Sequence, residues 1–369
     1  MRLGLFMMPV HPPARSFTET LAEDAEKSLL ADRLGFDELW MGEHFSATSE
    51  PIPSPLMFMA GLLPQTKTLR FGTGVINLPN HHPVVVAAEV AQFDHMSRGR
   101  FMLGVGPGGL LSDFELFGHT DVAVRNRKVV EAVRIMQRIW SQDPPYEIDG
   151  EFWNVRLKAN VVADLGIGYM PKPYQPGGPP ITLSLASPHS SSAATAAQHG
   201  WGIISANIIP TYSVASHWAI YSKACRAAGK RPAGENWRVA RNLMVAPTDA
   251  EARDRVFGDG ASNRYFFTYI RAALGGVGLL SILKPRPDMP DEDATVEAIT
   301  EGCILYGSPR TMLDKLVAFR DEVGPFGTLL MTGLDWLGPN EAWERQAMQL
   351  MAQDVMPKFR QHVGAQAAE

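Results

Sequence analysis

Short apolar segments alternate with longer amphipathic segments along almost the whole chain. The apolar segments predict buried strands, and the amphipathic segments, whose apolar residues recur every three or four positions, predict helices. The predicted strands cover residues 3–8, 38–41, 69–74, 101–105, 181–185, 201–205, 238–245 and 328–332. The predicted helices cover residues 18–34, 55–63, 83–96, 127–140, 190–199, 212–227, 309–323 and 341–358.

Regular alternation of strands and helices is typical of a parallel sheet. About eight strand–helix steps fit into the 369 residues, which favours a closed (β/α)₈ TIM barrel over a doubly wound sheet. The chain also lacks an early glycine-rich turn of the dinucleotide-binding type. We therefore expect an α/β protein in which residues 1–369 form one barrel domain.

Two segments depart from this rhythm. Residues 144–180 are rich in proline and glycine and predict a small insertion that contains a hairpin. Residues 257–295 hold several glycines and prolines. Long loops in compact enzymes often act as lids, so we predict a mobile loop there.

Composition narrows the classes of function. The chain is 45% hydrophobic and 20% charged, so it can bury a sizeable core. Its formal net charge of -5 gives no reason to expect nucleic acid or an anionic membrane as a partner. Apolar runs stay far below the roughly 20 residues of a membrane span. The two cysteines have no metal-type spacing, so we expect no metal site and a cytoplasmic location.

Histidine and glycine stand where the predicted strands end. His44 follows one strand, Gly74 and Val75 follow the next, and Gly106 lies in a glycine-rich turn after the third. In a barrel these ends form the catalytic face. A histidine there can act as an acid, a base or a hydrogen-bond donor, and glycine lets a flat ligand approach the backbone. Simple packing of the histidine and ordinary turn chemistry remain open as alternatives.

Two further groups are candidates for an anion site. Ser187, Ser190 and Ser191 precede a predicted helix, and hydroxyls with free N–H groups at a helix N-terminus bind anions. An ordinary helix cap would explain one serine equally well. Arg125 and Arg127 stand at the predicted start of another helix, where the helix dipole disfavours cations. An anionic partner or plain solvation would account for them.

Several motifs together resemble the bacterial luciferase-like flavin monooxygenases. They are Gly-Glu-His at 42–44, Gly-Thr-Gly-Val at 72–75, Leu-Pro-x-x-His-Pro at 78–83, Asp-His-Met-Ser-Arg-Gly-Arg-Phe at 94–101, Arg-x-x-x-Glu at 127–131, Ser-Pro-His-Ser-Ser at 187–191 and Gly-Ser-Pro at 307–309. The likeness covers nearly the whole chain. The length and the early Glu-His-Phe segment are closer to limonene and diketocamphane monooxygenases than to luciferase itself.

The resemblance implies a role for each candidate residue. His44 matches the histidine that acts on the flavin peroxide, and Gly74-Val75 matches a cis peptide bond against the flavin ring. Arg127 matches the arginine that meets the FMN phosphate, and Ser187, Ser190 and Ser191 fall in the phosphate loop. Gly106 stands beside the flavin where luciferase has a reactive cysteine, so light emission is not implied.

The resemblance also implies an activity. A separate flavin reductase would supply reduced FMN, oxygen would form a flavin C4a-(hydro)peroxide, and one oxygen atom would pass to a small apolar substrate. We expect Phe6, Met8, Met102 and Trp336 as candidate pocket walls, and a homodimer formed through helices early in the chain. A deazaflavin-dependent oxidoreductase and a non-catalytic flavin-binding protein remain alternatives.

Overall fold

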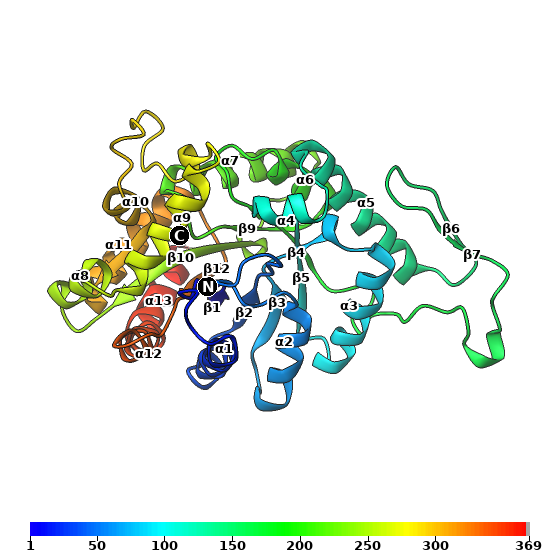
Figure 1. Cartoon of the computed structure of the whole chain (residues 1–369), viewed down its shortest axis with the longest axis horizontal. Helices are drawn as coiled ribbons and strands as arrows, with labels where there is room; N and C mark the ends of the chain where they lie inside the picture. Colours follow the sequence, from blue (N-terminus) through cyan, green and yellow to red (C-terminus); the bar gives the residue numbers. More distant parts are fainter. Residues whose placement is uncertain (367–369) are drawn as a thin grey trace.

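The computed structural model describes residues 1–366, and its centre is a closed barrel of parallel strands (Figure 1). The barrel strands are β1 (Arg2–Met7), β2 (Glu38–Met41), β3 (Arg70–Thr73), β5 (Phe101–Gly106), β8 (Ile181–Leu185), β9 (Gly202–Ser205), β10 (Trp237–Val245) and β12 (Thr328–Gly333). Each pairs in parallel with the next, and pairing of β12 with β1 closes the ring. The predicted TIM barrel and its eight strand positions are confirmed.

Helices surround the barrel (Figure 1). They are α1 (Phe17–Arg33), α2 (Pro55–Leu62), α3 (Pro83–Ser97), α4 (Leu111–Leu116), α5 (Val122–Ser141), α6 (Ser192–His199), α7 (Thr211–Ala227), α8 (Asp249–Phe257), α9 (Ser262–Gly275), α10 (Val296–Cys303), α11 (Pro309–Val323), α12 (Asn340–Leu350) and α13 (Met356–Gln366). Short additional strands are β4 (Ile76–Asn77), β6 (Tyr146–Ile148), β7 (Val155–Leu157) and β11 (Ile304–Gly307). None of the helices within residues 1–366 is long and apolar enough to cross a membrane.

The barrel interior is filled by side chains that point inward from different strands. Phe6, Trp40, Met102, Ile204, Ala240 and Leu330 form one buried cluster. Trp40 is fully buried, and a Cβ added at Gly72 would lie 2.6 Å from its ring. Small residues on one strand therefore make room for a large one on its neighbour, as close packing of a narrow barrel requires.

A buried ion pair closes the end of the barrel where the strands begin. Glu38 has no exposed surface, and its carboxylate accepts hydrogen bonds from Arg238 Nε at 2.9 Å and Trp40 Nε1 at 2.8 Å. Arg2 adds a third contact at 3.2 Å. Burial alone would raise the pKa of Glu38, but the charge of Arg238 holds it below its ordinary value.

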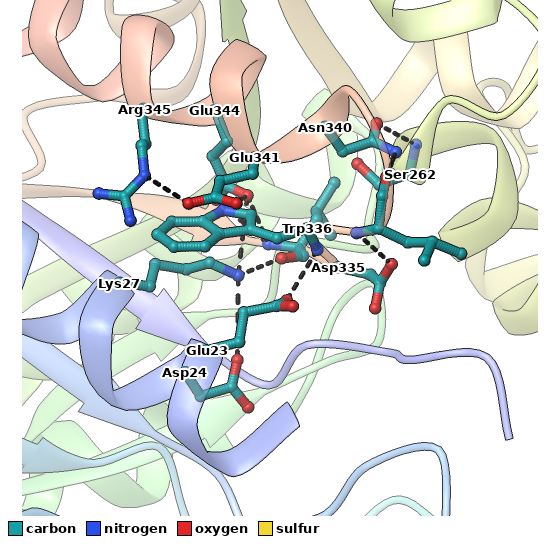
Figure 2. A network of polar contacts seen from close by, with 12 residues as sticks. Glu23, Asp24, Lys27, Ser262, Asp335, Trp336, Asn340, Glu341, Glu344 and Arg345 are labelled. Carbon is teal, nitrogen blue, oxygen red and sulfur yellow. Dashed lines mark hydrogen bonds and ion pairs between the residues drawn. The ribbon is translucent and has the colours of Figure 1, made fainter. Parts of the chain in front are cut away.

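The opposite end joins the first helix to the last part of the chain (Figure 2). Trp336, which follows β12, donates from its indole to Glu344 of α12 at 2.9 Å and from its backbone to Glu23 of α1 at 2.7 Å. The buried ammonium of Lys27 lies 3.7 Å from Glu344. Asn340 Oδ1 accepts from Ser262 N at 2.9 Å, which fixes the start of α9.

A second ion cluster lies beside this network. His11 places one ring nitrogen 2.6 Å from Asp335 and the other 3.2 Å from Asp24. Arg15 pairs with Asp335 at 2.6 Å and with Glu23 at 2.7 Å. His11, Glu23 and Asp24 lie close enough together to hold a metal ion, but His11 and Arg15 already pair with the carboxylates, so we interpret the group as an ion-pair cluster.

The two irregular segments have different outcomes. Residues 144–180 form the predicted insertion, in which β6 and β7 pair as an antiparallel hairpin that projects from the barrel (Figure 1). Residues 257–295 are not a continuous loop, because helix α9 occupies residues 262–275. Glycines and prolines flank this helix but lie outside its first three turns. Their number made the whole segment resemble a loop, although the residues between them have helical spacing.

Candidate functional site

A cavity opens at the end of the barrel where the strands terminate. It encloses about 1080 Å³, including its mouth, and most of its lining is apolar. The residues that line it are Phe6, Met8, Val10, Glu43, His44, Glu50, Gly74, Val75, Asn77, Gly108, Gly109, Leu110, Ser184, Ala186, Ile204, Ala206, Asn207, Ile208, Phe266, Tyr269, Ile270, Ala273 and Leu274. An apolar cleft with a few convergent polar groups is the usual form of a small-molecule site.

One wall of the cavity consists of backbone and small residues. The peptide bond between Gly74 and Val75 is cis, and both residues line the cavity. Gly106 lies directly behind this wall: a Cβ there would be 2.8 Å from Val75 Cγ2 and 2.5 Å from Ser184 Oγ. The wall therefore has little room for larger side chains and presents a surface suited to a flat ligand.

His44 lies between two carboxylates. Its Nδ1 is 3.2 Å from Asp113 of α4, and its Nε2 is 3.3 Å from Glu50. Burial by itself would lower the pKa of His44, but the charge of Glu50 and the hydrogen bond to Asp113 raise it. These contacts favour the protonated ring, which would donate one hydrogen bond to each carboxylate.

Asp113 is fixed by the loop that carries His44. Its carboxylate accepts hydrogen bonds from Phe45 N at 3.2 Å and Ser46 N at 2.9 Å. Burial opposes its ionisation, but these contacts and His44 keep the pKa of Asp113 below its ordinary value. Asp113 therefore stays charged and orients the imidazole.

Glu43 ties this loop to the backbone beyond the cis peptide. Its Oε1 accepts from Asn77 N at 2.8 Å, and His81 Nε2 lies 2.9 Å away. Burial acts to lower the pKa of His81, but the hydrogen bond to Glu43 and its charge raise it, so the pKa lies above its ordinary value. Asn77 returns a hydrogen bond from Nδ2 to the Glu43 carbonyl. His81 is thus part of the scaffold that sets the position of His44.

The predicted serines lie at the start of α6, beside Ser184 and Ala186 of the cavity rim. The helix begins at Ser192, two residues later than predicted, and its N-cap Ser191 makes no side-chain capping bond. The carbonyl of Ser187 accepts from His217 Nε2 at 2.8 Å. Burial lowers the pKa of His217 to about 4, so this histidine is neutral and fixes the loop. Ala193 N and Ala194 N donate to the Ser190 and Ser191 carbonyls, so an anion here would be bound by the serine hydroxyls and by the N–H groups that precede Ala193.

Arg127 does not line the cavity. It lies in α5, which begins at Val122 because Asp121 caps it, so neither Arg125 nor Arg127 starts a helix as predicted. The Arg127 side chain is about half exposed and pairs with Glu151 at 2.9 Å. Its role as a phosphate ligand stays a prediction and requires Glu151 to be exchanged for phosphate.

The predicted wall residues divide into two groups. Phe6 and Met8 line the cavity, whereas Met102 packs inside the barrel against Arg238 and Trp336 lies in the network of Figure 2. Met102 belongs to the buried cluster inside the barrel, and Trp336 is bonded to Glu23 and Glu344, so strand position alone was not enough to place them at the cavity.

Helix α9 supplies the wall that sequence analysis missed. Phe266, Tyr269, Ile270, Ala273 and Leu274 face the cavity. Glu50 and Asp113 were also missed. Glu50 follows no strand, and Asp113 lies in a short helix, so only their proximity to His44 identifies them.

The proteins that this chain resembles in sequence and in structure include several monooxygenases. A sequence model described as luciferase-like monooxygenase matches residues 1–324. A 4-hydroxyprotoasukamycin monooxygenase from Streptomyces nodosus subsp. asukaensis is 31% identical, over 96% of this chain and 91% of the relative. Limonene 1,2-monooxygenase from Rhodococcus erythropolis is 29% identical, over 98% and 87%. The oxygenating constituent of 3,6-diketocamphane monooxygenase from Pseudomonas putida, a type II Baeyer–Villiger monooxygenase solved with FMN, superposes with a TM-score of 0.86 at 26% identity, over 97% and 98%.

Proposed function

The chain belongs to the luciferase-like monooxygenase family, and from that premise we propose that it is the oxygenase of a two-component system. In this proposal a separate reductase supplies reduced FMN, and one atom of O₂ passes to a small apolar organic substrate. The observation that carries the proposal is the cavity itself, in which a histidine held between two carboxylates meets a backbone wall and a mostly apolar lining.

The described residues fit FMN. The Gly74–Val75 backbone, with Gly106 packed behind it, offers a flat wall for a ring system, and the chain leads from Ala186 in the cavity lining to the start of α6, where the phosphate would lie. Ser187, Ser190, Ser191 and, after release of Glu151, Arg127 would hold that phosphate. FMN is favoured over a deazaflavin because a solved relative with 26% identity and a TM-score of 0.86 is a complex with FMN, whereas the F420-dependent neighbours are 17% and 18% identical.

Each part of the cavity has a task in this proposal. Reduced flavin, when bound, supplies the electrons that activate oxygen. His44 then donates a hydrogen bond or a proton where negative charge develops, and Asp113 keeps its ring oriented. Helix α9 covers the cavity and excludes water, which would otherwise divert the reaction.

The substrate class follows from the lining. Phe6, Met8, Ile204, Phe266 and Leu274 offer apolar contacts and few hydrogen-bond partners, so affinity must come from buried apolar surface. The names of the relatives mention limonene and diketocamphane. We propose a substrate of similar size and polarity.

A homodimer and a cytoplasmic location complete the proposal. Met57 of α2 and Val85 and Met96 of α3 are large apolar side chains exposed to solvent on the helices early in the chain, and these helices would form the interface. Both cysteines are buried and free, which suits a reducing compartment. We treat residues 1–369 as one domain, of which 367–369 lie outside the described part.

The test begins with stopped-flow mixing of the protein–reduced FMN complex with oxygenated buffer. We expect a transient absorbance spectrum that differs from reduced and oxidised FMN. A screen of terpenes, ketones and aldehydes with a generic flavin reductase and isotopically labelled O₂ should give a product with one labelled oxygen atom. Reductase without this protein is the control. Binding of reduced deazaflavin but not reduced FMN would reject the FMN assignment, and the absence of any transient would reject the monooxygenase.

A further inference from the structure

The carboxylate of Glu50 connects the catalytic histidine to helix α9. Its Oε2 lies 3.3 Å from His44 Nε2, and its Oε1 accepts a hydrogen bond from Tyr269 OH at 3.0 Å. Only 7% of Glu50 is exposed. Tyr269 lies in α9, and both residues line the cavity, so this contact requires α9 to pack over the cavity.

We infer that Glu50 is a positioning residue for His44, and that Tyr269 holds Glu50 in place, so that the seating of α9 determines the orientation and charge of the catalytic ring. The role of this contact in catalysis rests on the proposed function. Its geometry is independent of flavin.

His44 and Glu50 lie in one loop, which backbone hydrogen bonds hold in shape. The backbone N–H of His44 donates to the Ile52 carbonyl at 3.3 Å, and Glu50 N donates to Ala47 O at 3.1 Å. The short span between His44 and Ile52 is thus fixed at both ends. The Glu50 side chain has little freedom to move away from the imidazole.

Helix α9 is anchored at its start. Asn340 binds the backbone at both Ser262 and Gly260, at 2.9 Å each. From that anchor the helix presents Tyr265 and Tyr269 one turn apart. The Tyr265 hydroxyl reaches the His11 carbonyl at 3.5 Å, whereas the Tyr269 hydroxyl reaches the Glu50 carboxylate.

The groups around Glu50 explain why its hydrogen bond from Tyr269 affects the charge of the carboxylate. Burial raises the pKa of Glu50, and Asp113 adds to this, while His44 and the Tyr269 hydroxyl act in the opposite direction. Burial and Glu50 also raise the pKa of Tyr269, so the phenol stays protonated and donates. His44 and Tyr269 therefore both favour the charged carboxylate against the effect of burial.

The remaining titratable neighbours shift the pKa values of His44 and Tyr269. Glu43 and Asp113 raise the pKa of His44 together with Glu50, and Tyr265 raises the pKa of Tyr269. Asp113 faces Nδ1, so Glu50 is the group that faces Nε2. Loss of Tyr269 would leave Glu50 more readily protonated and would remove negative charge from that side of the ring.

The test compares three variants in flavin-free protein. Glu50→Gln removes the charge with little change of shape, and Tyr269→Phe removes only the hydroxyl. Tyr265→Phe is the matched control, because it removes a hydrogen-bonded hydroxyl from the same helix without touching Glu50. The pKa of His44 is measured by NMR titration of labelled histidine. A His44→Asn spectrum assigns the signal among the ten histidines.

We expect the pKa of His44 to fall most in Glu50→Gln, less in Tyr269→Phe, and to stay at the parent value in Tyr265→Phe. With reduced FMN, oxygen and a substrate that the parent protein oxygenates, Tyr269→Phe should release more hydrogen peroxide per flavin oxidised than Tyr265→Phe, because less of the oxygen is transferred to the substrate. An unchanged His44 pKa in Glu50→Gln, or equal values in the two tyrosine variants, would overturn the inference. Shifted pKa values without any oxygenation would support the inference and reject the proposed function.

Discussion

Replacement of Glu38 by alanine should lower the free energy of unfolding and leave the affinity for FMN unchanged. Glu38 lies at the end of the barrel where the strands begin, and its fully buried carboxylate binds Arg238 through Nε and Nη2 as well as Trp40 Nε1. The Arg238 guanidinium is also almost fully buried. Glu38→Ala therefore leaves an uncompensated charge inside the barrel.

The expected cost follows from that geometry. Removal of one partner from a buried ion pair costs about 3–5 kcal/mol, because the remaining charge keeps its desolvation penalty. This is a large share of the roughly 5–15 kcal/mol that stabilises a typical protein. The folded-state pKa of Glu38 is depressed, so the parent has this stabilisation above the unfolded-state pKa and loses it as the pH falls through the folded-state value.

The assay is urea denaturation at neutral pH, followed by titration of reduced FMN into the folded protein. Glu341→Ala is the matched control, because Glu341 is half exposed in its pair with Arg345 and should cost about 0–1 kcal/mol. FMN affinity should be unchanged in both variants, since the cavity lies at the other end of the barrel. Equal stability of the two variants would refute the reasoning about the ion pair. Loss of FMN affinity in folded Glu38→Ala would refute the placement of the site.

Four further predictions concern single residues. Burial lowers the pKa of His11, but Asp24 and Asp335 raise it from the ordinary 6.5 to about 9. The stabilisation that His11 contributes should therefore be complete below pH 6.5 and be lost as the pH rises through about 9, and His11→Asn should remove this loss in a series of denaturation curves. Gly106→Val should raise the dissociation constant of FMN, since its Cβ would already crowd Val75 at 2.8 Å; an unchanged constant in fluorescence titration would contradict this. Arg127→Ala should weaken FMN binding in the same titration, and a constant equal to the parent value would reject the phosphate role. His44→Ala should slow oxygenation far more than it weakens FMN binding, and unchanged turnover would exclude the histidine from the reaction.

Local patterns were sufficient for the barrel. Each barrel strand is a short apolar run, and each is followed by an amphipathic helix, so the period of the apolar residues identified all eight strands. The same patterns placed His44 and Gly74 at strand ends, and both line the cavity. Helix α9 was missed because glycine and proline on either side resembled a loop, although its apolar face covers the cavity.

The partners of His44 could not be found in this way. Asp113 is 69 residues from His44 along the chain, and Tyr269 is 219 residues from Glu50. Neither contact has a periodic signal, because each depends on where loops from different strands meet. The same applies to Arg127, whose predicted role came from a motif and whose side chain pairs with Glu151 at the surface.

The sequence by itself determined the order of strands and helices, the end of the barrel where the cavity opens, and the family of relatives. These properties depend on residues close together in the chain and on the alternation of apolar and polar positions. Only the tertiary structure decided that His44 lies between two carboxylates and that α9 reaches Glu50 through Tyr269. The physical reason is that closure of the barrel brings distant loops to one edge, where burial and charge act on groups that no local pattern connects.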